Sequence, residues 1–183
     1  MYMGRGKHLR FLRHLGQFRF KMWLDRNASQ VLSEVGIGEG DKVLDFGSGS
    51  GTFTIPAAKL VGNNGGVYAL DVSRRALNKL DAKGEKEGLD NIVTLFSSGE
   101  VEIALSDRVL DHVLLIDVLQ EIPDKKGLLD EVNRIMKSNG IVTVYPMHID
   151  VEEVVRIASD SNLKLKEKKF QERVLVFEKK TEV

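Results

Sequence analysis

The residues of this chain best suited to chemistry lie in one glycine-rich stretch, Asp45-Phe46-Gly47-Ser48-Gly49-Ser50-Gly51. The stretch follows an apolar run at 42–44 and precedes a helical pattern at 52–60. A strand that ends in a glycine-rich turn and restarts as a helix arranges backbone N–H groups around a ligand. Glycine suits this turn because a side chain would hold the backbone away from the ligand, and because the turn can require positive φ.

A second carboxylate, Asp71, follows Gly51 by twenty residues and ends the next apolar run, at 67–70. At such a place a carboxylate can accept hydrogen bonds from both hydroxyls of a ribose. The alternative role of Asp71 is the N-cap of the helix that follows. The loop alone is also compatible with a purely structural turn. Together with Asp71 it indicates a cofactor that contains a nucleoside.

The glycine spacing indicates which cofactor. Dinucleotide enzymes use G-x-G-x-x-G, in which the third glycine packs the helix on the strand. Here Thr52 occupies that third position, and the glycines follow G-x-G-x-G. This form resembles the first motif of class I S-adenosylmethionine-dependent methyltransferases. That cofactor has no pyrophosphate, so the loop need only fit a ribose and an amino-acid tail.

The composition narrows the class of protein further. The 183 residues suit one domain with a sizeable core, and 42% hydrophobic with 30% charged residues is ordinary for a soluble protein. The chain contains no cysteine, which excludes disulfides, cysteine-ligated zinc and cysteine nucleophiles. Four scattered histidines do not form a metal-ligand set, so we expect no metal. We find no membrane-spanning run and no signal peptide, and expect a cytoplasmic protein.

The net charge is zero, but the charges are unevenly distributed along the chain. Residues 1–30 contain seven Lys or Arg and one acid, and the remainder contains twenty against twenty-six. We therefore divide the chain into a basic helical arm, 1–36, and a cofactor-binding domain, 37–183. We prefer the interpretation that the arm is a solvated surface that docks on the acidic body. The alternative is a contact to an anionic substrate, a nucleic acid or a membrane surface.

Beyond the arm, strand and helix patterns alternate. In the arm, Gly16 should interrupt a first helix, and Asp25 or Asn27 should cap a second that stops at Gly36. Ser73 and Asp124 should cap later helices, and a short helix is possible at 100–105. The strands are expected at 42–46, 67–71, 91–96, 111–116, 141–145, 163–166 and 173–178, with helices at 52–61, 73–88, 124–136 and 151–159.

The last two strands are separated by too few residues for a crossover helix, so they should pair as an antiparallel hairpin. The pattern predicts an α/β fold with a doubly wound, seven-stranded, mostly parallel sheet closed by one antiparallel strand. This is similar to the class I methyltransferase fold, and the resemblance covers residues 41–179. It implies the strand order 3-2-1-4-5-7-6.

Further segments match that family. Residues 67–73 look like its second motif, 98–102 stand where many members have Gly-Asp-Ala-Glu, and 111–119 and 128–140 resemble the segments around its fourth and fifth strands. Among its members the chain looks closest to the menaquinone and ubiquinone methyltransferases. It departs from the family in having Glu100 in place of the usual Asp beside the adenine. The link at 146–150 is short where many members insert a lid.

The carboxyl ends of the strands should gather the functional residues in one crevice. The resemblance implies cofactor contacts from Asp45, Phe46, Gly47, Ser48, Gly49, Gly51, Thr52, Asp71, Val72, Gly99, Glu100 and Asp117. Simpler roles remain open for three of them. Asp45 could only hold the loop, Glu100 could only favour a helix start, and Asp117 could be a simple cap.

Methyl transfer requires alignment of donor and acceptor, exclusion of water and, for some acceptors, a base. We take His148 as the candidate base, since imidazole titrates near working pH, with Asp117 as a second candidate. A surface histidine is the alternative for His148. Tyr145 could orient a substrate or pack the core, and His112 should lie far from the site. Phe11, Phe18, Phe20 and Trp23 should pack their helix rather than line a pocket.

We therefore expect an S-adenosylmethionine-dependent methyltransferase that acts at oxygen or carbon of a small-molecule acceptor. One rival is an RNA methyltransferase that uses the basic arm. Another is a non-catalytic cofactor-binding subunit that docks a partner through the arm. A nicotinamide dehydrogenase is disfavoured by Thr52 and the closing hairpin. An oligomer remains possible, because a neighbouring subunit could close the crevice.

Overall fold

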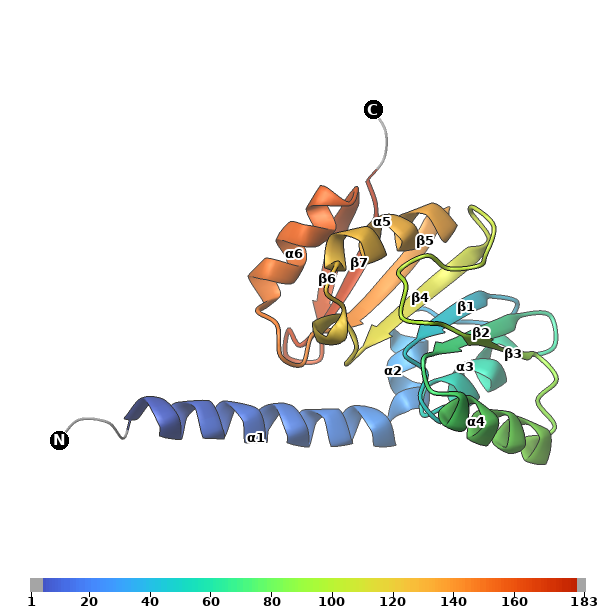
Figure 1. The fold of residues 1–183 in the computed structure, drawn as a ribbon, viewed down its shortest axis with the longest axis horizontal. Coiled ribbons are helices and arrows are strands. Elements are labelled where there is room, and N and C mark those ends of the chain that lie inside the picture. Colours follow the sequence, from blue (N-terminus) through green and yellow to red (C-terminus); the bar gives the residue numbers. More distant parts are fainter. Residues whose placement is uncertain (1–4, 181–183) are drawn as a thin grey trace.

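A computed structural model describes the backbone of residues 5–180, with side chains from Gly16 onward. In this part of the chain, seven strands form one sheet in the order β3-β2-β1-β4-β5-β7-β6, as the resemblance implied (Figure 1). The strands are β1 Lys42–Phe46, β2 Gly66–Asp71, β3 Ile92–Phe96, β4 Leu110–Ile116, β5 Met136–Tyr145, β6 Leu163–Lys169 and β7 Val174–Lys179.

The pairing confirms the predicted doubly wound sheet. Strands β1 to β5 pair parallel with one another, whereas β7 runs antiparallel to both β5 and β6. Strand β4 is almost wholly buried, and apolar from Val113 to Ile116, because helices cover both faces of the sheet at that position. The order of the strands reverses between β1 and β4, which is the place where such sheets bind ligands.

Helices pack on the two faces of the sheet. They are α1 Arg5–Arg26, α2 Ala28–Glu34, α3 Thr54–Val61, α4 Arg74–Glu87, α5 Lys125–Ile135 and α6 Val151–Asp160, with a 3-10 turn at Leu119–Glu121. Apolar residues of α5 and α6 form the core on one face with alternate residues of β4, β5 and β7. Those of α2, α3 and the end of α1 form the core on the other, and α4 adds a small cluster there.

Two predicted caps are present. The side chain of Ser73 accepts from Ala76 N at the start of α4, and that of Asp124 accepts from Gly127 N at the start of α5. Asn27 occupies the N-cap position of α2, but its side chain donates to the carbonyl of Trp23 instead of capping. The predicted N-cap position of Asn27 is therefore confirmed, whereas the predicted hydrogen bond from its side chain to the start of α2 is not formed.

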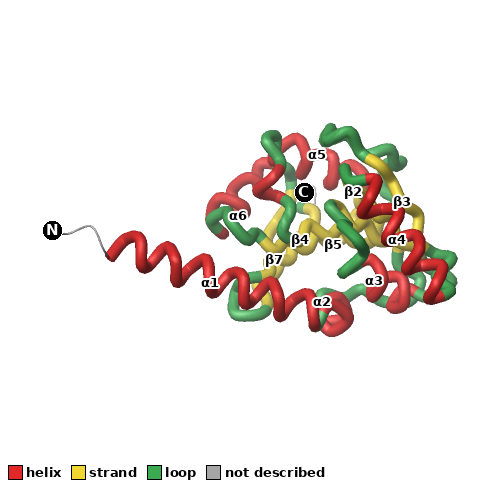
Figure 2. Tube along the Cα trace, turned by 60° about the horizontal axis from the view of Figure 1, so that its bottom comes forward, coloured by secondary structure: helices red, strands yellow, loops and turns green. Residues whose placement is uncertain are grey.

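The predicted break at Gly16 is wrong, because α1 is continuous through it (Figure 2). A glycine inside a helix costs only about 1 kcal/mol relative to alanine. Contacts with the body hold this turn of the helix. Arg173 donates to the carbonyl of Gly16 at 3.2 Å, and the hydroxyl of Tyr145 donates to the carbonyl of Gln17 at 3.1 Å.

Two boundaries also differ from the prediction. Helix α3 begins at Thr54 rather than at 52, because the glycine turn continues through Phe53. Helix α5 ends at Ile135, and Met136 already pairs with Leu110 as the first residue of β5. An irregularity takes up 137–140, so the regular pairing resumes with Ile141 beside His112.

The two edge strands of the sheet differ in character. At one edge, β6 contains Lys164, Lys166, Lys168 and Lys169. At the other, β3 leaves Val93 and Phe96 about half exposed, at 49% and 44%. The guanidinium of Arg74 lies over the ring of Phe96, 3.7 Å from its centroid.

Candidate functional site

The carboxyl ends of β1, β2 and β4 bring three carboxylates to the point where the strand order reverses. Asp45 is the fourth residue of β1, Asp71 ends β2, and Asp117 directly follows β4. Parallel strands point the same way, so these positions share one edge of the sheet. The three carboxylates therefore lie at the sheet edge where the crevice was predicted, and the glycine loop follows β1 at the same edge.

Gly47, Gly49 and Gly51 of the loop all have positive φ. They differ in what a side chain at each position would contact. A Cβ on Gly47 would lie 2.7 Å from Cγ2 of Val118, and one on Gly51 would collide with Leu80. These two residues therefore need glycine for packing. Gly49, with φ +53°, has no atom within 4 Å of where a Cβ would be. Its backbone faces open space, so a ligand can approach it closely.

The N–H groups of the loop are largely used within the protein. Those of Gly47 and Ser48 donate to the carbonyl of Leu70, and that of Gly51 donates to Ser48. Gly49 N donates to Oδ2 of Asp71 at 2.7 Å. A loop whose donors are already bonded offers little to a pyrophosphate, which agrees with the exclusion of dinucleotides made from the glycine spacing.

The carboxylate of Asp71 is fixed in orientation at both oxygens. Oδ2 accepts from Gly49 N, and Oδ1 accepts from Ser73 N at 2.8 Å. Each carboxylate oxygen can accept a second hydrogen bond, so both can still receive the hydroxyls of a diol. The Asp71 carboxylate thus joins the loop to the start of α4, while Ser73 rather than Asp71 provides the side-chain cap of that helix.

Asp45 is buried, at 3% exposure, below the loop. Its Oδ2 accepts from the hydroxyl of Thr54 at 2.6 Å, which ties β1 to the first turn of α3. Burial raises the pKa of the Asp45 carboxyl to about 6, and the charge of Asp71 adds to this, while Thr54 opposes it. A cationic ligand group beside Asp45 would restore its ionised form.

Other loop residues predicted to contact a cofactor have different placements. The Ser48 hydroxyl is buried and has no hydrogen-bond partner in the described part of the chain, so a ligand could satisfy it. The side chain of Phe46 belongs to the core, so any ligand contact there would come from its main chain. Thr52 is exposed in the turn before α3.

The adenine-side candidates lie directly after β2 and on the segment after β3. Val72 is 63% exposed and therefore accessible to a ligand. Gly99 has φ +101°, and Glu100 is exposed. Glu100 lines a cavity of about 360 Å³ together with Leu70, Phe96 and Ser97.

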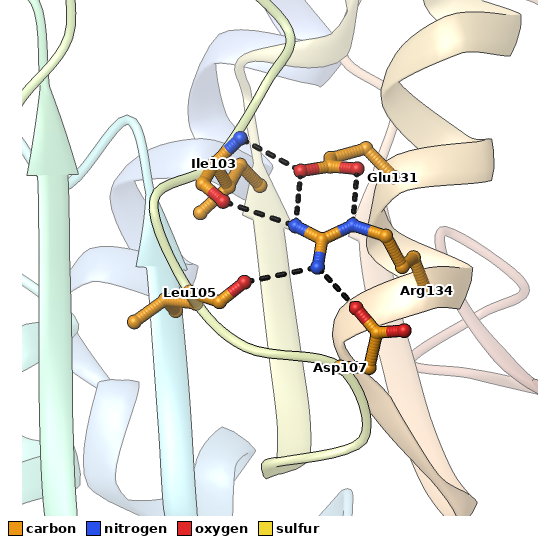
Figure 3. A network of polar contacts seen from close by, with 5 residues as sticks. All are labelled: Ile103, Leu105, Asp107, Glu131 and Arg134. Carbon is orange, nitrogen blue, oxygen red and sulfur yellow. Dashed lines mark hydrogen bonds and ion pairs between the residues drawn. The ribbon is translucent and has the colours of Figure 1, made fainter.

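The short helix considered at 100–105 is absent, and Arg134 of α5 supplies the physical reason (Figure 3). Its guanidinium donates to the carbonyls of Ile103 and Leu105, and Leu105 N donates to the carbonyl of Ile103 two residues back, where a helix would use a carbonyl four residues back. The remaining donors go to Glu131 and Asp107, so all five N–H groups are bonded. Glu131 in turn accepts from Ile103 N at 2.8 Å.

We call Arg134 with Glu131 the clamp, because the pair binds both backbone groups of Ile103. The hydrogen bond to Glu131 raises the pKa of the Arg134 guanidinium, and the same bond lowers the pKa of the Glu131 carboxyl. The clamp replaces the regular secondary structure that 97–107 lacks. It thereby fixes the segment that carries Glu100 against the body of the protein.

Asp117, His148 and Tyr145 lie toward the other side of the crevice. Asp117 has φ +57° and accepts from Nε2 of Gln120 at 2.8 Å. Burial raises the pKa of its carboxyl, and Gln120, Lys21 and His148 oppose the rise. His148 is therefore close enough to act on Asp117 electrostatically. Tyr145 is 2% exposed, and burial raises the pKa of its phenol to about 12.

Sequence reasoning missed the part that α1 plays at the crevice. Lys21 lies near both Asp45 and Asp117, lowering the pKa of each, and its ammonium pairs with Asp25 at 2.6 Å. Only the fold could reveal this, because α1 is positioned by contacts with residues far away in the chain, such as Tyr145 and Arg173. Phe20 packs on Tyr145, with ring centroids 5.4 Å apart, as expected of a packing aromatic.

Between α1, the 146–150 link and the β6–β7 turn lies a cavity of about 450 Å³. Gln17, Tyr145 and Arg173 are among its lining residues. The side-chain oxygen of Gln17 is buried and has no hydrogen-bond partner within the described residues, so the cavity offers an unsatisfied acceptor. The helix α1 thus supplies cover that the short link at 146–150 does not.

His112 lies outside the crevice, as expected. His112 is buried beside Asp41, with 3.3 Å between Nε2 and Oδ2, in β4 and away from the crevice. No group of three or more His, Cys, Asp or Glu among the described residues could hold a metal ion. Within the same residues, no helix is long and apolar enough to cross a membrane. The side chain of Phe11 lies outside the described part.

The two kinds of loop glycine give a testable contrast in stability. Gly47→Ala should lower the free energy of unfolding by about 2–3 kcal/mol, because it adds a clash with Val118 to an unfavourable φ. Gly49→Ala should cost about 1 kcal/mol, since only the backbone conformation opposes it. Urea unfolding of both variants checks the order, and equal losses would contradict the steric assignment.

Comparisons with known proteins agree with this geometry. A family model described as a methyltransferase domain matches residues 37–179. Demethylmenaquinone methyltransferase of Staphylococcus aureus strain MRSA252 is 33% identical over 122 residues, or 67% of this chain and 48% of that protein. The chain thus spans about half the length of the curated relatives it matches.

Solved structures share the fold. The crystal structure of an S-adenosylmethionine-dependent methyltransferase from Aquifex aeolicus superposes with a TM-score of 0.75 at 26% identity, covering 84% of this chain and 89% of that one. The [4+2]-cyclase SpnF superposes with a TM-score of 0.68 at 17% identity, covering 78% of this chain and 58% of that one. The second likeness concerns the fold alone, which hosts more than one kind of chemistry.

Proposed function

Since the chain belongs to the family of S-adenosylmethionine-dependent methyltransferases, we propose that it transfers a methyl group to an oxygen or a ring carbon of a small quinone-type acceptor. The observation that carries the proposal is the Asp71 carboxylate. It is held at both oxygens beside a glycine loop whose own donors are used, so the crevice favours a ribose over a phosphate. The likeness to a demethylmenaquinone methyltransferase supports the acceptor class.

The residues present fit the cofactor on four counts. Gly49 leaves room for close approach, and the buried Ser48 hydroxyl lacks a partner among the described residues. Asp71 can accept from ribose hydroxyls, and Asp45 would gain from a cationic group. We propose that Val72, Gly99 and Glu100 contact the adenine, with Glu100 accepting from its amino group. Phe46, Gly47, Gly51 and Thr52 shape the loop.

S-adenosylmethionine supplies a methyl group on a sulfonium, which is already activated for in-line displacement. The work left to the chain is to align the acceptor and exclude water. Tyr145, fixed by its bond to Gln17, and the turn of α1 above it close that side of the crevice. The cavity of about 450 Å³ beside them falls in the size range of small-molecule sites and is where we place the acceptor.

A hydroxyl or ring C–H acceptor must lose a proton as the new bond forms. We propose that Asp117 and His148 share this role, since the two are electrostatically coupled and lie past the ends of β4 and β5. The raised pKa of the Asp117 carboxyl makes it a better proton acceptor than an exposed aspartate. Gln120 holds that carboxyl in place.

The proposed function is tested by binding and turnover together. S-adenosylhomocysteine should bind with a dissociation constant on the order of 1 μM in calorimetry. Incubation with labelled cofactor and a short-chain naphthohydroquinone should yield a methylated product by mass spectrometry. Absence of heat with S-adenosylhomocysteine, alongside tight binding of a nicotinamide cofactor, would remove the proposal. Methyl transfer to RNA instead of the hydroquinone would replace the acceptor class.

Asp45 should make cofactor binding depend on pH. The carboxyl of the free protein has a pKa of about 6, and a bound ammonium group favours its ionised form. Affinity should therefore be constant above pH 7 and fall toward tenfold per pH unit below about 6, because the proton must leave on binding. Calorimetry across this range measures the slope. Asp45→Asn should bind more weakly with a flatter profile, and an unchanged slope would refute the assignment.

A further inference from the structure

Aromatic, aliphatic and basic side chains gather on the solvent side of α1. We call Phe18, Arg19, Met22, Trp23 and Arg26 the outer face of α1, since their spacing places them along one side of the helix. Phe18 is 56% exposed, Met22 38% and Trp23 37%. They make up half of the large apolar side chains that the described residues leave exposed, all within one and a half turns of helix.

The charge of α1 is strongly one-sided. Its sequence contains seven Lys or Arg and a single acid, Asp25. That acid is already paired with Lys21 on the side toward the crevice. Neither Arg19 nor Arg26 makes an ion pair with any residue that the structure describes, although the body of the chain is acidic. The exposed cations are therefore available to an external anion.

The opposite side of the same helix contacts the crevice. Leu24 is fully buried against the body, and Lys21 lies near Asp45 and Asp117. The figures show α1 running outward from α2, with its first turns extending past the rest of the molecule (Figures 1 and 2). The outer face thus belongs to the same helix whose Gly16 and Gln17 line the proposed acceptor cavity.

We propose that the outer face of α1 docks on the surface of an anionic lipid membrane, from which a lipid-soluble acceptor enters the crevice. This rests on the proposed function for the identity of the acceptor, but not for the docking itself. Aromatic rings settle at the headgroup level of a membrane, and basic side chains beside them are attracted to anionic headgroups. Each cation near an anionic surface adds to the attraction.

The same observations disfavour two other occupants. A second α1 would bring seven like charges against seven, with one acid on each helix to offset them. Single-stranded RNA would use the cations and the aromatic rings, but it would leave the aliphatic Met22 between them without a partner. An anionic bilayer surface satisfies all five residues of the outer face at once.

The chain contains a built-in reporter for this proposal, because Trp23 is its only tryptophan. Mixing the full chain with vesicles of equal parts phosphatidylglycerol and phosphatidylcholine should shift its emission to shorter wavelength and co-sediment the protein. Pure phosphatidylcholine vesicles should do neither, and added salt should reverse the binding. Arg19→Glu with Arg26→Glu should weaken vesicle binding several-hundredfold, since the two reversals make four charge steps at roughly fivefold each.

A matched control changes two lysines that have the same seven-residue spacing on another helix. Lys79→Glu with Lys86→Glu changes two exposed cations seven residues apart on α4 and should leave vesicle binding within about twofold. Phe18→Ser with Met22→Ser tests the apolar contribution and should abolish the emission shift. Binding of S-adenosylhomocysteine in solution should be unchanged in all three double variants, which separates failure of docking from failure of the proposed function.

Three outcomes would overturn the docking proposal. The first is no emission shift and no co-sedimentation with anionic vesicles. The second is a shift that appears on concentrating the protein alone, which would assign the outer face to a second copy. The third is salt-dependent binding to single-stranded RNA that the Arg19 and Arg26 changes abolish, with no affinity for vesicles.

Discussion

Asp71→Ala is expected to weaken binding of S-adenosylhomocysteine on the order of a hundredfold, or about 3 kcal/mol. The substitution removes a charged acceptor for two ribose hydroxyls. It also leaves the N–H groups of Gly49 and Ser73 without their present partner, so the loop loses the bond that holds its central glycine. Calorimetry at neutral pH measures the loss directly.

A control must separate this effect from a change in net charge. Asp90→Ala removes an exposed carboxylate from the turn before β3 and should leave the affinity within about twofold. The Asp71 variant should remain folded, with a loss of only about 1–2 kcal/mol in unfolding free energy, since its hydrogen bonds are partly exposed. An affinity equal to that of the parent chain would refute the assignment of the ribose to Asp71.

Arg134→Met is expected to reduce the free energy of unfolding by about 2–3 kcal/mol, a discounted figure because the side chain is about a third exposed. The change leaves the carbonyl of Leu105 without this donor, that of Ile103 with only Leu105 N, and the charge of Glu131 without its partner. Because the clamp fixes the segment that carries Glu100, binding of S-adenosylhomocysteine should also weaken roughly tenfold. Urea unfolding and calorimetry give the two numbers.

The double variant Arg134→Met with Glu131→Met sharpens this test. It should be less destabilised than the sum of the single variants, because no uncompensated charge remains near Ile103. Lys126→Met is the matched control, since it breaks an exposed ion pair with Asp130 on the same helix and should change stability little. If Arg134→Met were as mild as Lys126→Met, the clamp would have no structural role.

Much of the sheet could be predicted because its signals are local. Buried parallel strands read as apolar runs, the hairpin follows from the short link before β7, and Ser73 and Asp124 cap where capping chemistry predicts. The glycine spacing predicted a loop unsuited to pyrophosphate, and its internally bonded N–H groups agree. Each of these features depends on residues close together in the chain.

What the sequence could not show depends on contacts between distant residues. Gly16 should weaken a helix, but Arg173, 157 positions away, bonds its carbonyl and supports the turn. Residues 100–105 could form a helix, but Arg134 binds the carbonyls of Ile103 and Leu105 and Glu131 binds Ile103 N, so the segment is held in an irregular conformation. Lys21 reaches the crevice only because α1 packs across it. Side-chain bonds to distant backbone groups leave no periodic pattern in the sequence.

The unlike edges of the sheet determine where misassembly between molecules would start. A strand that adds to an edge must approach its free N–H and carbonyl groups, and the lysines of β6 would have to be desolvated and brought together for it to do so. Strand β3 presents Val93 and Phe96 instead, with Arg74 as its one covering cation. We therefore expect partly unfolded copies to aggregate through β3. A charged residue in place of Val93 should reduce this aggregation more than a charge elsewhere on the edges of the sheet.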